Sequence, residues 1–205
     1  EVYYEALLYF GGKAADYGNK SNPSNQTGST YTSGGNKYYV SPISSECDKN
    51  YIVMLSDGQP TKDDVSATRQ GVLPGFTVGS CSTTYTSSAW DDNKNAFNSD
   101  TATDDNCMDE LSGWAATNDV AQDASIKAHD GIQHLTTHTI GFQLGDPGGI
   151  QLMKDTAKKG GGEFFEADSE AKLISIFNLI IASALQVNST FSSPAVSVNA
   201  FNRST

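Results

Sequence analysis

The stretch from Asn50 to Gly58 reads NYIVMLSDG and decides the fold of this 205-residue chain. Its five consecutive apolar residues, Tyr51 to Leu55, are followed at once by a polar turn that begins at Ser56. A short run that is apolar at every position has both of its faces buried, which is typical of a parallel strand covered by helices on each side. We therefore expect a central strand of an α/β protein here.

Helical and extended patterns alternate along the rest of the chain. Apolar residues at helical spacing predict helices over residues 1–10, 62–70, 107–117, 150–158 and 168–187, and β-branched or aromatic runs predict strands over 136–142 and 163–167. In the longest predicted helix, the residues expected to face inward are Leu173, Ile176, Phe177, Ile180, Ile181 and Ala184. Strand–helix alternation with right-handed crossovers gives an open, mostly parallel, Rossmann-like sheet flanked by helices.

Two long polar segments and a change of period interrupt this pattern. Residues 13–37 and 72–106 are rich in Ser, Thr, Asn and Gly, so we expect surface insertions there, with strand-like pieces around 75–78. From residue 188 the apolar residues recur at every second position, which predicts an extended segment. We therefore divide the chain into an α/β domain at 1–187 and a β exit segment at 188–205 that leads into a following β-domain.

Charge and hydropathy exclude several classes of partner. The formal net charge of −11 leaves no basic surface to displace the counterions of nucleic acid, so we expect no nucleic-acid partner. No apolar run reaches the ~20 residues that a membrane-spanning helix needs, so we expect no membrane span. Because the chain begins at Glu1 and not at a methionine, we expect a fragment or a processed product.

Three cysteines, Cys47, Cys81 and Cys107, leave one thiol over if two of them pair. Cys81 and Cys107 bracket a Ser-, Thr-, Asp- and Asn-rich segment, which a disulfide would hold together in the absence of a core. We predict that pairing, with Cys47 free or bonded outside this sequence. The alternative is three buried thiols in a reducing compartment.

Ser56 and Asp57 are the candidate metal ligands. Ligands of open α/β sheets bind outside the carboxyl ends of the strands, where these two residues fall. A carboxylate and a hydroxyl are hard oxygen ligands suited to Mg²⁺ or Ca²⁺, although this site would be incomplete within the chain. The alternative is an ordinary turn in which Asp57 binds its own backbone. No motif of a nucleophile, phosphate loop or dinucleotide site occurs, and we do not expect an enzyme.

The string from Asn50 to Pro60, with Cys47 just before it, resembles the third metal-site loop of a von Willebrand factor A domain. The version it most resembles belongs to the tip-associated proteins of bacterial type IV pili. Residues 1–10, 107–114, 131–142, 152–167 and 190–203 resemble further stretches of that family, in family order. Residues upstream that carry the family's first motif and second-loop threonine are not in this sequence, so only Asp57 and Ser56 correspond to metal-site positions.

The resemblance implies a von Willebrand factor A-like domain that is extracellular, on the bacterial surface at the pilus tip. The implied partners are minor pilins of the pilus tip complex, together with host or surface ligands. Three other functions stay open at this point. They are a free-standing extracellular A-domain adhesin with no pilus link, a cation-dependent hydrolase, and a purely structural filament component.

Overall fold

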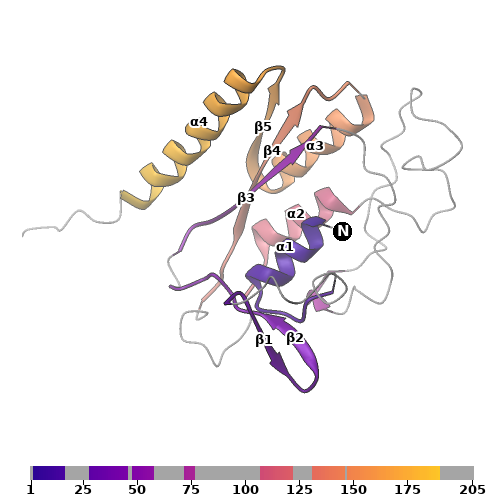
Figure 1. Cartoon of the computed structure of the whole chain (residues 1–205), viewed down its shortest axis with the longest axis vertical. Helices are drawn as coiled ribbons and strands as arrows, with labels where there is room; N and C mark the ends of the chain where they lie inside the picture. Colours follow the sequence, from indigo (N-terminus) through magenta and orange to yellow (C-terminus); the bar gives the residue numbers. More distant parts are fainter. Residues whose placement is uncertain are drawn as a thin grey trace, which may run out of the picture.

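The computed structural model describes residues 2–16, 28–45, 48–57, 72–76, 107–121, 131–145 and 147–189. These residues form an α/β arrangement, shown in Figure 1. The elements, in chain order, are α1 (Val2–Phe10), β1 (Thr30–Ser33), β2 (Asn36–Tyr39), β3 (Asn50–Ser56), α2 (Met108–Thr117), β4 (Leu135–Phe142), α3 (Pro147–Lys159), β5 (Gly161–Ala167) and α4 (Glu170–Ser189).

The main sheet has three strands in the order β3-β4-β5, and both pairs are parallel. This confirms the prediction of a parallel sheet flanked by helices. The predicted central position of β3 is wrong within the described residues, because β4 is central and β3 is an edge strand. The burial agrees with this order: Ile140 of β4 is fully buried, whereas Leu55 of β3 is 46% exposed.

Two helices, α1 and α2, and one face of the sheet contribute to the larger core. Tyr4, Leu7 and Leu8 of α1 are buried there with Leu111 and Trp114 of α2. Polar side chains fix the helices to β4 on this face. The Tyr3 hydroxyl lies 2.6 Å from the Thr137 hydroxyl, and the Thr139 hydroxyl donates to the Met153 carbonyl of α3 at 2.7 Å. Every hydroxyl that β4 buries on this side is thereby paired with a helix, as buried polar groups require.

The opposite face of the sheet packs against α4 alone among the described helices. Ile176 and Ile180 of α4 are buried against Ile140 and Ala167. Leu173, Phe177 and Ala184 are partly buried, as the spacing predicts. The inward position predicted for Ile181 is wrong, because that side chain is 54% exposed. The reason is that apolar residues surround this helix on several sides, so periodicity alone does not select the buried one.

A β-hairpin begins in the first polar segment, residues 13–37, where the sequence predicted a surface insertion, and continues to Tyr39. β1 and β2 pair antiparallel around Gly34 and Gly35, whose φ angles of 57° and 83° suit a tight hairpin turn. The hairpin is fixed to α1 by Tyr39, whose hydroxyl donates to Glu5 at 2.5 Å and whose ring packs edge-on against Tyr9. Figure 1 shows it at the opposite end of the molecule from α4.

Several predicted boundaries shift. α3, predicted over 150–158, begins at Pro147, so Gly148 and Gly149 lie within it. α4 continues to Ser189, so the first two residues of the predicted exit segment are helical. Residues 72–76, near the expected strand-like pieces, form a tight turn in which the Phe76 amide donates to the Leu73 carbonyl. The predicted helix at 62–70, residues 77–106 and the exit from 190 onward lie outside the described residues.

Candidate functional site

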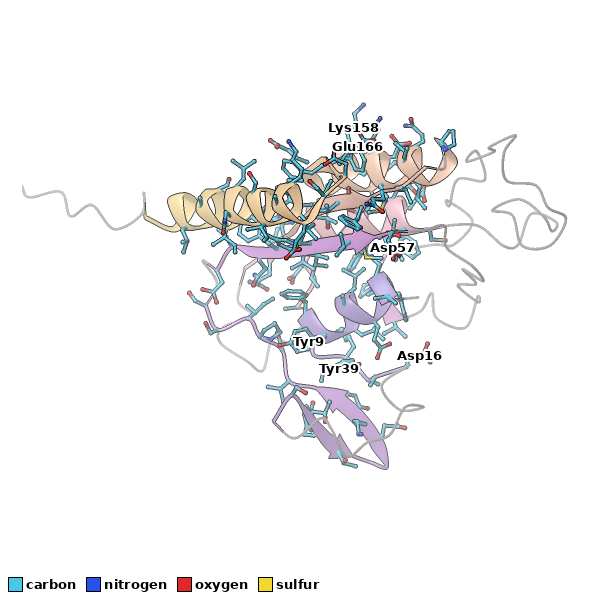
Figure 2. All side chains as sticks on the ribbon, turned by 45° about the horizontal axis from the view of Figure 1, so that its top comes forward. Tyr9, Asp16, Tyr39, Asp57, Lys158 and Glu166 are labelled. Carbon is cyan, nitrogen blue, oxygen red and sulfur yellow. The ribbon has the colours of Figure 1, made fainter. Side chains whose placement is uncertain are left out.

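Ser56 and Asp57 lie at the carboxyl end of β3, as predicted. Ser56 is the last residue of the strand and is in register with Gly141 of β4. Asp57 follows it and is exposed, and Figure 2 shows it at the end of β3. Strand β3 ends here because the apolar run gives way to polar residues. The Asp57 carboxylate therefore faces solvent at the edge where ligands of open α/β sheets bind.

The neighbouring strand ends are tied together by Gln143, which sequence reasoning did not single out. Gln143 has φ of 51°, in the left-handed region that non-glycine residues rarely adopt. Its backbone amide donates to the Ala167 carbonyl at 2.9 Å, and its side-chain amide donates to the Asp168 carbonyl at 3.1 Å. These two hydrogen bonds fix the ends of β4 and β5 relative to each other. The strained backbone sits beside the predicted site, where such outliers concentrate.

The donor set is incomplete within the part of the chain that the structure describes. Its chemistry fits a hard cation, because Ser56 and Asp57 offer a hydroxyl and a carboxylate and no sulfur or imidazole. No group of three or more His, Cys, Asp and Glu side chains in the described ranges is arranged to hold a metal ion. A cation at Asp57 would therefore need oxygen ligands from elsewhere, including water and a bound partner.

Cys107 precedes α2, is fully buried and is disulfide-bonded. Its partner, and both Cys81 and Cys47, lie outside the described residues, so the pairing of Cys81 with Cys107 stays a prediction. The bond holds the start of α2 at a point where the helix has no side-chain cap. It therefore stabilises the end of a helix that contributes Leu111 and Trp114 to the core.

A partly buried charged cluster joins α2 to α3, and no local sequence pattern predicts it. The Lys159 ammonium lies 2.5 Å from an Asp109 carboxylate oxygen and 2.8 Å from a Glu110 oxygen. Asp109 is fully buried, and burial raises the pKa of Glu110 from 4.5 to about 7, with a further contribution from Asp109 and an opposing one from Lys159. Perturbed acids accompany catalytic sites as well as structural ion pairs. Here the Lys159 ammonium lies against both carboxylates, and the resulting ion pairs stabilise the contact between α2 and α3.

The two histidines that the structure describes, His134 and His138, do not share a site. His138 lies on β4 and accepts a hydrogen bond from the Glu163 amide at its Nδ1 atom, 3.1 Å away. Burial lowers its pKa, and its ring stacks on Tyr51. His134 precedes the same strand, and four residues of extended chain separate the two rings too widely for one ion.

The fold and the strand-end residues define an α/β protein with a three-stranded parallel sheet flanked by helices, an arrangement compatible with Rossmann-like folds. Comparison with protein-family models, with curated proteins and with solved structures gives no match for the chain. Among the described helices, none combines the length and the apolar character that crossing a bilayer requires. The function therefore has to be argued from the residues and their arrangement.

Proposed function

We propose that this chain is an extracellular binding protein of the von Willebrand factor A type, which acts at the tip of a bacterial type IV pilus in adhesion and pilus assembly. The observation that carries the proposal is the Ser-Asp pair at the carboxyl end of a parallel strand, with Asp57 exposed. The sequence from Asn50 to Pro60 supports the same class, because it resembles the metal-site loop of that family.

In this proposal Asp57 and Ser56 hold a Mg²⁺ or Ca²⁺ ion, directly or through water. The ion would supply an open coordination position for a carboxylate of the bound protein. The surrounding residues keep the pair in place: the register of Ser56 with Gly141 fixes the strand end, and the Gln143 hydrogen bonds fix the neighbouring strand ends. The net charge of −11 makes an acidic partner unfavourable without such an ion.

The partners that fit the proposal are minor pilins of the tip complex and ligands on host cells or other surfaces. The exposed rim of the strand ends is polar, which suits a reversible contact more than an obligate one. An adhesin with this domain but no connection to pili shares the same contact chemistry. The location of the protein on the cell distinguishes the two.

Cation binding is tested by titrating the chain with Mg²⁺, Ca²⁺ and Mn²⁺ in a calorimeter. We expect binding that Asp57→Ala weakens about tenfold or more, because the only carboxylate in the pair is removed. Asp168→Ala is the matched control, since Asp168 is also an exposed aspartate just after a strand, β5. Equal affinities of the wild type and the Asp57 variant would contradict a cation site at this position.

Immunogold electron microscopy of intact cells tests the location. We expect gold particles at pilus ends when an antibody against this domain is used. Particles spread over the cell surface with none on pili would contradict the pilus role and leave the free-standing adhesin. A strain that lacks the gene serves as the control for antibody specificity.

A further inference from the structure

An open groove runs between β5 and α4, on the sheet edge opposite to the Ser56–Asp57 pair. Its volume is about 550 Å³, within the range of ~300–1,000 Å³ typical of binding pockets. The lining residues that matter here are Phe164, Phe165 and Glu166 of β5 and Lys172, Ser175 and Leu179 of α4. Leu179 is 56% exposed, and Figure 1 shows α4 extending alongside β5. The groove therefore combines a strand edge with a helix flank that carries polar side chains beside the apolar Ile176 and Leu179.

The strand that borders the groove is the last one of the sheet. Within the described residues β5 pairs with β4 only, so its other side has no strand. The Ala167 carbonyl points toward β4, where it accepts a hydrogen bond from the Gln143 amide. Backbone groups of alternate residues in a strand point to opposite edges, so those of Phe164 and Glu166 point toward the groove. Such a row of donors and acceptors is a template for a further strand.

Both walls of the groove offer side-chain contacts to an added strand. Phe165 faces α4 and packs in the cluster that contains Ile176 and Ile180. Phe164 points to the other face, where the Lys154 ammonium of α3 lies 5.5 Å from its ring centroid. Because side chains of a strand alternate between faces, every second residue of an added strand would lie between Phe165 and Leu179. The intervening residues would lie beside Phe164 and Glu166.

We propose that this groove binds an extended peptide segment of a partner protein, which joins the sheet as a strand beside β5. The segment carries apolar side chains at alternate positions, for the flank at Leu179, and neutral or basic side chains between them, for Glu166. Main-chain hydrogen bonds supply affinity in this mode, and the alternate pockets supply specificity.

Charge selects a partner segment over a second copy of this chain. Glu163 and Glu166 are both exposed on β5, so edge-to-edge pairing of two copies would place four carboxylates along one seam. Each copy also carries a net charge of −11. Charged residues on edge strands oppose this kind of self-pairing, and they favour a segment of opposite charge. The proposal does not depend on the cation site, which lies at the other edge of the sheet.

The test uses the 205-residue chain labelled with ¹⁵N and three synthetic peptides that differ only at two positions: TVKVTVK, TVTVTVT and TVEVTVE. We expect affinity to fall in the order lysine, threonine, glutamate, and the amide signals of Phe164 and Glu166 to shift on binding. Two further versions of the best peptide carry N-methyl groups on its odd or on its even residues. Only one of these two should lose binding, because only alternate amides of an added strand face β5.

The matched protein variants are Leu179→Asp and Ile181→Asp, which change residues of the same helix with 56% and 54% exposure. Leu179→Asp should weaken peptide binding about tenfold or more. Ile181 does not line the groove, so Ile181→Asp should leave peptide binding unchanged. Circular dichroism of both variants reports whether they fold.

Three outcomes would overturn the proposal. The first is the absence of any amide shift with all three peptides at ~1 mM, the weak end of specific binding. The second is an equal effect of the two methylation patterns, which would exclude strand addition. The third is a dimer in sedimentation equilibrium that Leu179→Asp dissociates, because a second copy would then occupy the groove.

Discussion

Replacing Glu110 with glutamine should make the protein more stable at pH 8 and leave its stability nearly unchanged at pH 4. Glu110 lies in the charged cluster of α2 and α3, with 12% of its side chain exposed. Burial there raises its pKa from 4.5 to about 7, so the folded protein holds this proton more tightly than the unfolded chain does. The stability that the proton contributes is complete below pH 4.5 and is lost as the pH rises to 7.

The magnitude follows from the size of the shift. Each pKa unit corresponds to about 1.4 kcal/mol, so a shift from 4.5 to about 7 sets an upper limit of about 3 kcal/mol. Lys159, the cation of the cluster, is 43% exposed, so water screens these charges and we take about half of that limit. The glutamine variant should therefore gain ~1–2 kcal/mol over the wild type at pH 8. For a domain of this size the melting temperature would rise by about 3–6 °C.

The assay uses circular dichroism to monitor the urea unfolding of the wild type and Glu110→Gln, at steps between pH 4 and pH 9. The difference between the two proteins separates the contribution of this cluster from that of titrating groups elsewhere in the chain. Glu166→Gln is the matched control, because Glu166 is exposed and lies outside the cluster. A difference that is the same at pH 4 and pH 8, or a loss of stability at pH 8, would refute the reasoning.

Two further predictions concern the backbone and the cysteines. Gly162→Ala should destabilise the protein by about 3 kcal/mol and lower its melting temperature by ~6–12 °C, because the new Cβ would lie 2.1 Å from the Thr137 carbonyl oxygen of β4. Thermal unfolding measures this effect. Peptide mapping under non-reducing conditions should recover Cys81 and Cys107 in one linked peptide, since Cys107 is disulfide-bonded and Cys81 is its predicted partner.

Each of these two predictions has its own control. Gly145→Ala adds the same methyl group where no atom lies within 4 Å, so its stability should stay within about 0.5 kcal/mol of the wild type. A melting temperature for Gly162→Ala equal to that of this control would contradict the steric argument. For the cysteines, mapping after reduction should release two separate peptides. Recovery of Cys107 linked to Cys47 would show that the predicted pairing is wrong.

The elements of the α/β core could be predicted because each carries a local signal. The apolar run at Tyr51–Leu55 and the β-branched run at Thr136–Phe142 predict strands from the residues themselves. The helix over 107–117 follows from spacing that depends only on neighbouring residues. The hairpin was missed although Gly34-Gly35 between Tyr- and Thr-containing segments is a turn signal. The residues around this turn are so polar that no alternation of apolar and polar residues indicated the two strands.

Long-range placement could not be predicted in the same way. Fifty residues separate Lys159 from Asp109, and nothing in either local sequence shows that their helix ends meet. The position of β3 at the edge of the described sheet depends on which strands lie beside it, whereas an apolar run reports only that both faces are covered. The role of Gln143 could not be predicted either, because it depends on a backbone angle that no motif encodes.

The exposed apolar residues of α4 connect the unpredicted features to function. A helix that packs on one sheet face needs a single apolar side, yet α4 also exposes Ile174, Leu179 and Ile181, each by more than half. Residues of this kind on more than one side are characteristic of a helix that contacts more than one neighbour. One neighbour is the sheet, through Ile176 and Ile180. The flank at Leu179 lies beside the β5 edge, where backbone groups and apolar side chains meet, so the proposed strand addition accounts for that part of the exposed surface.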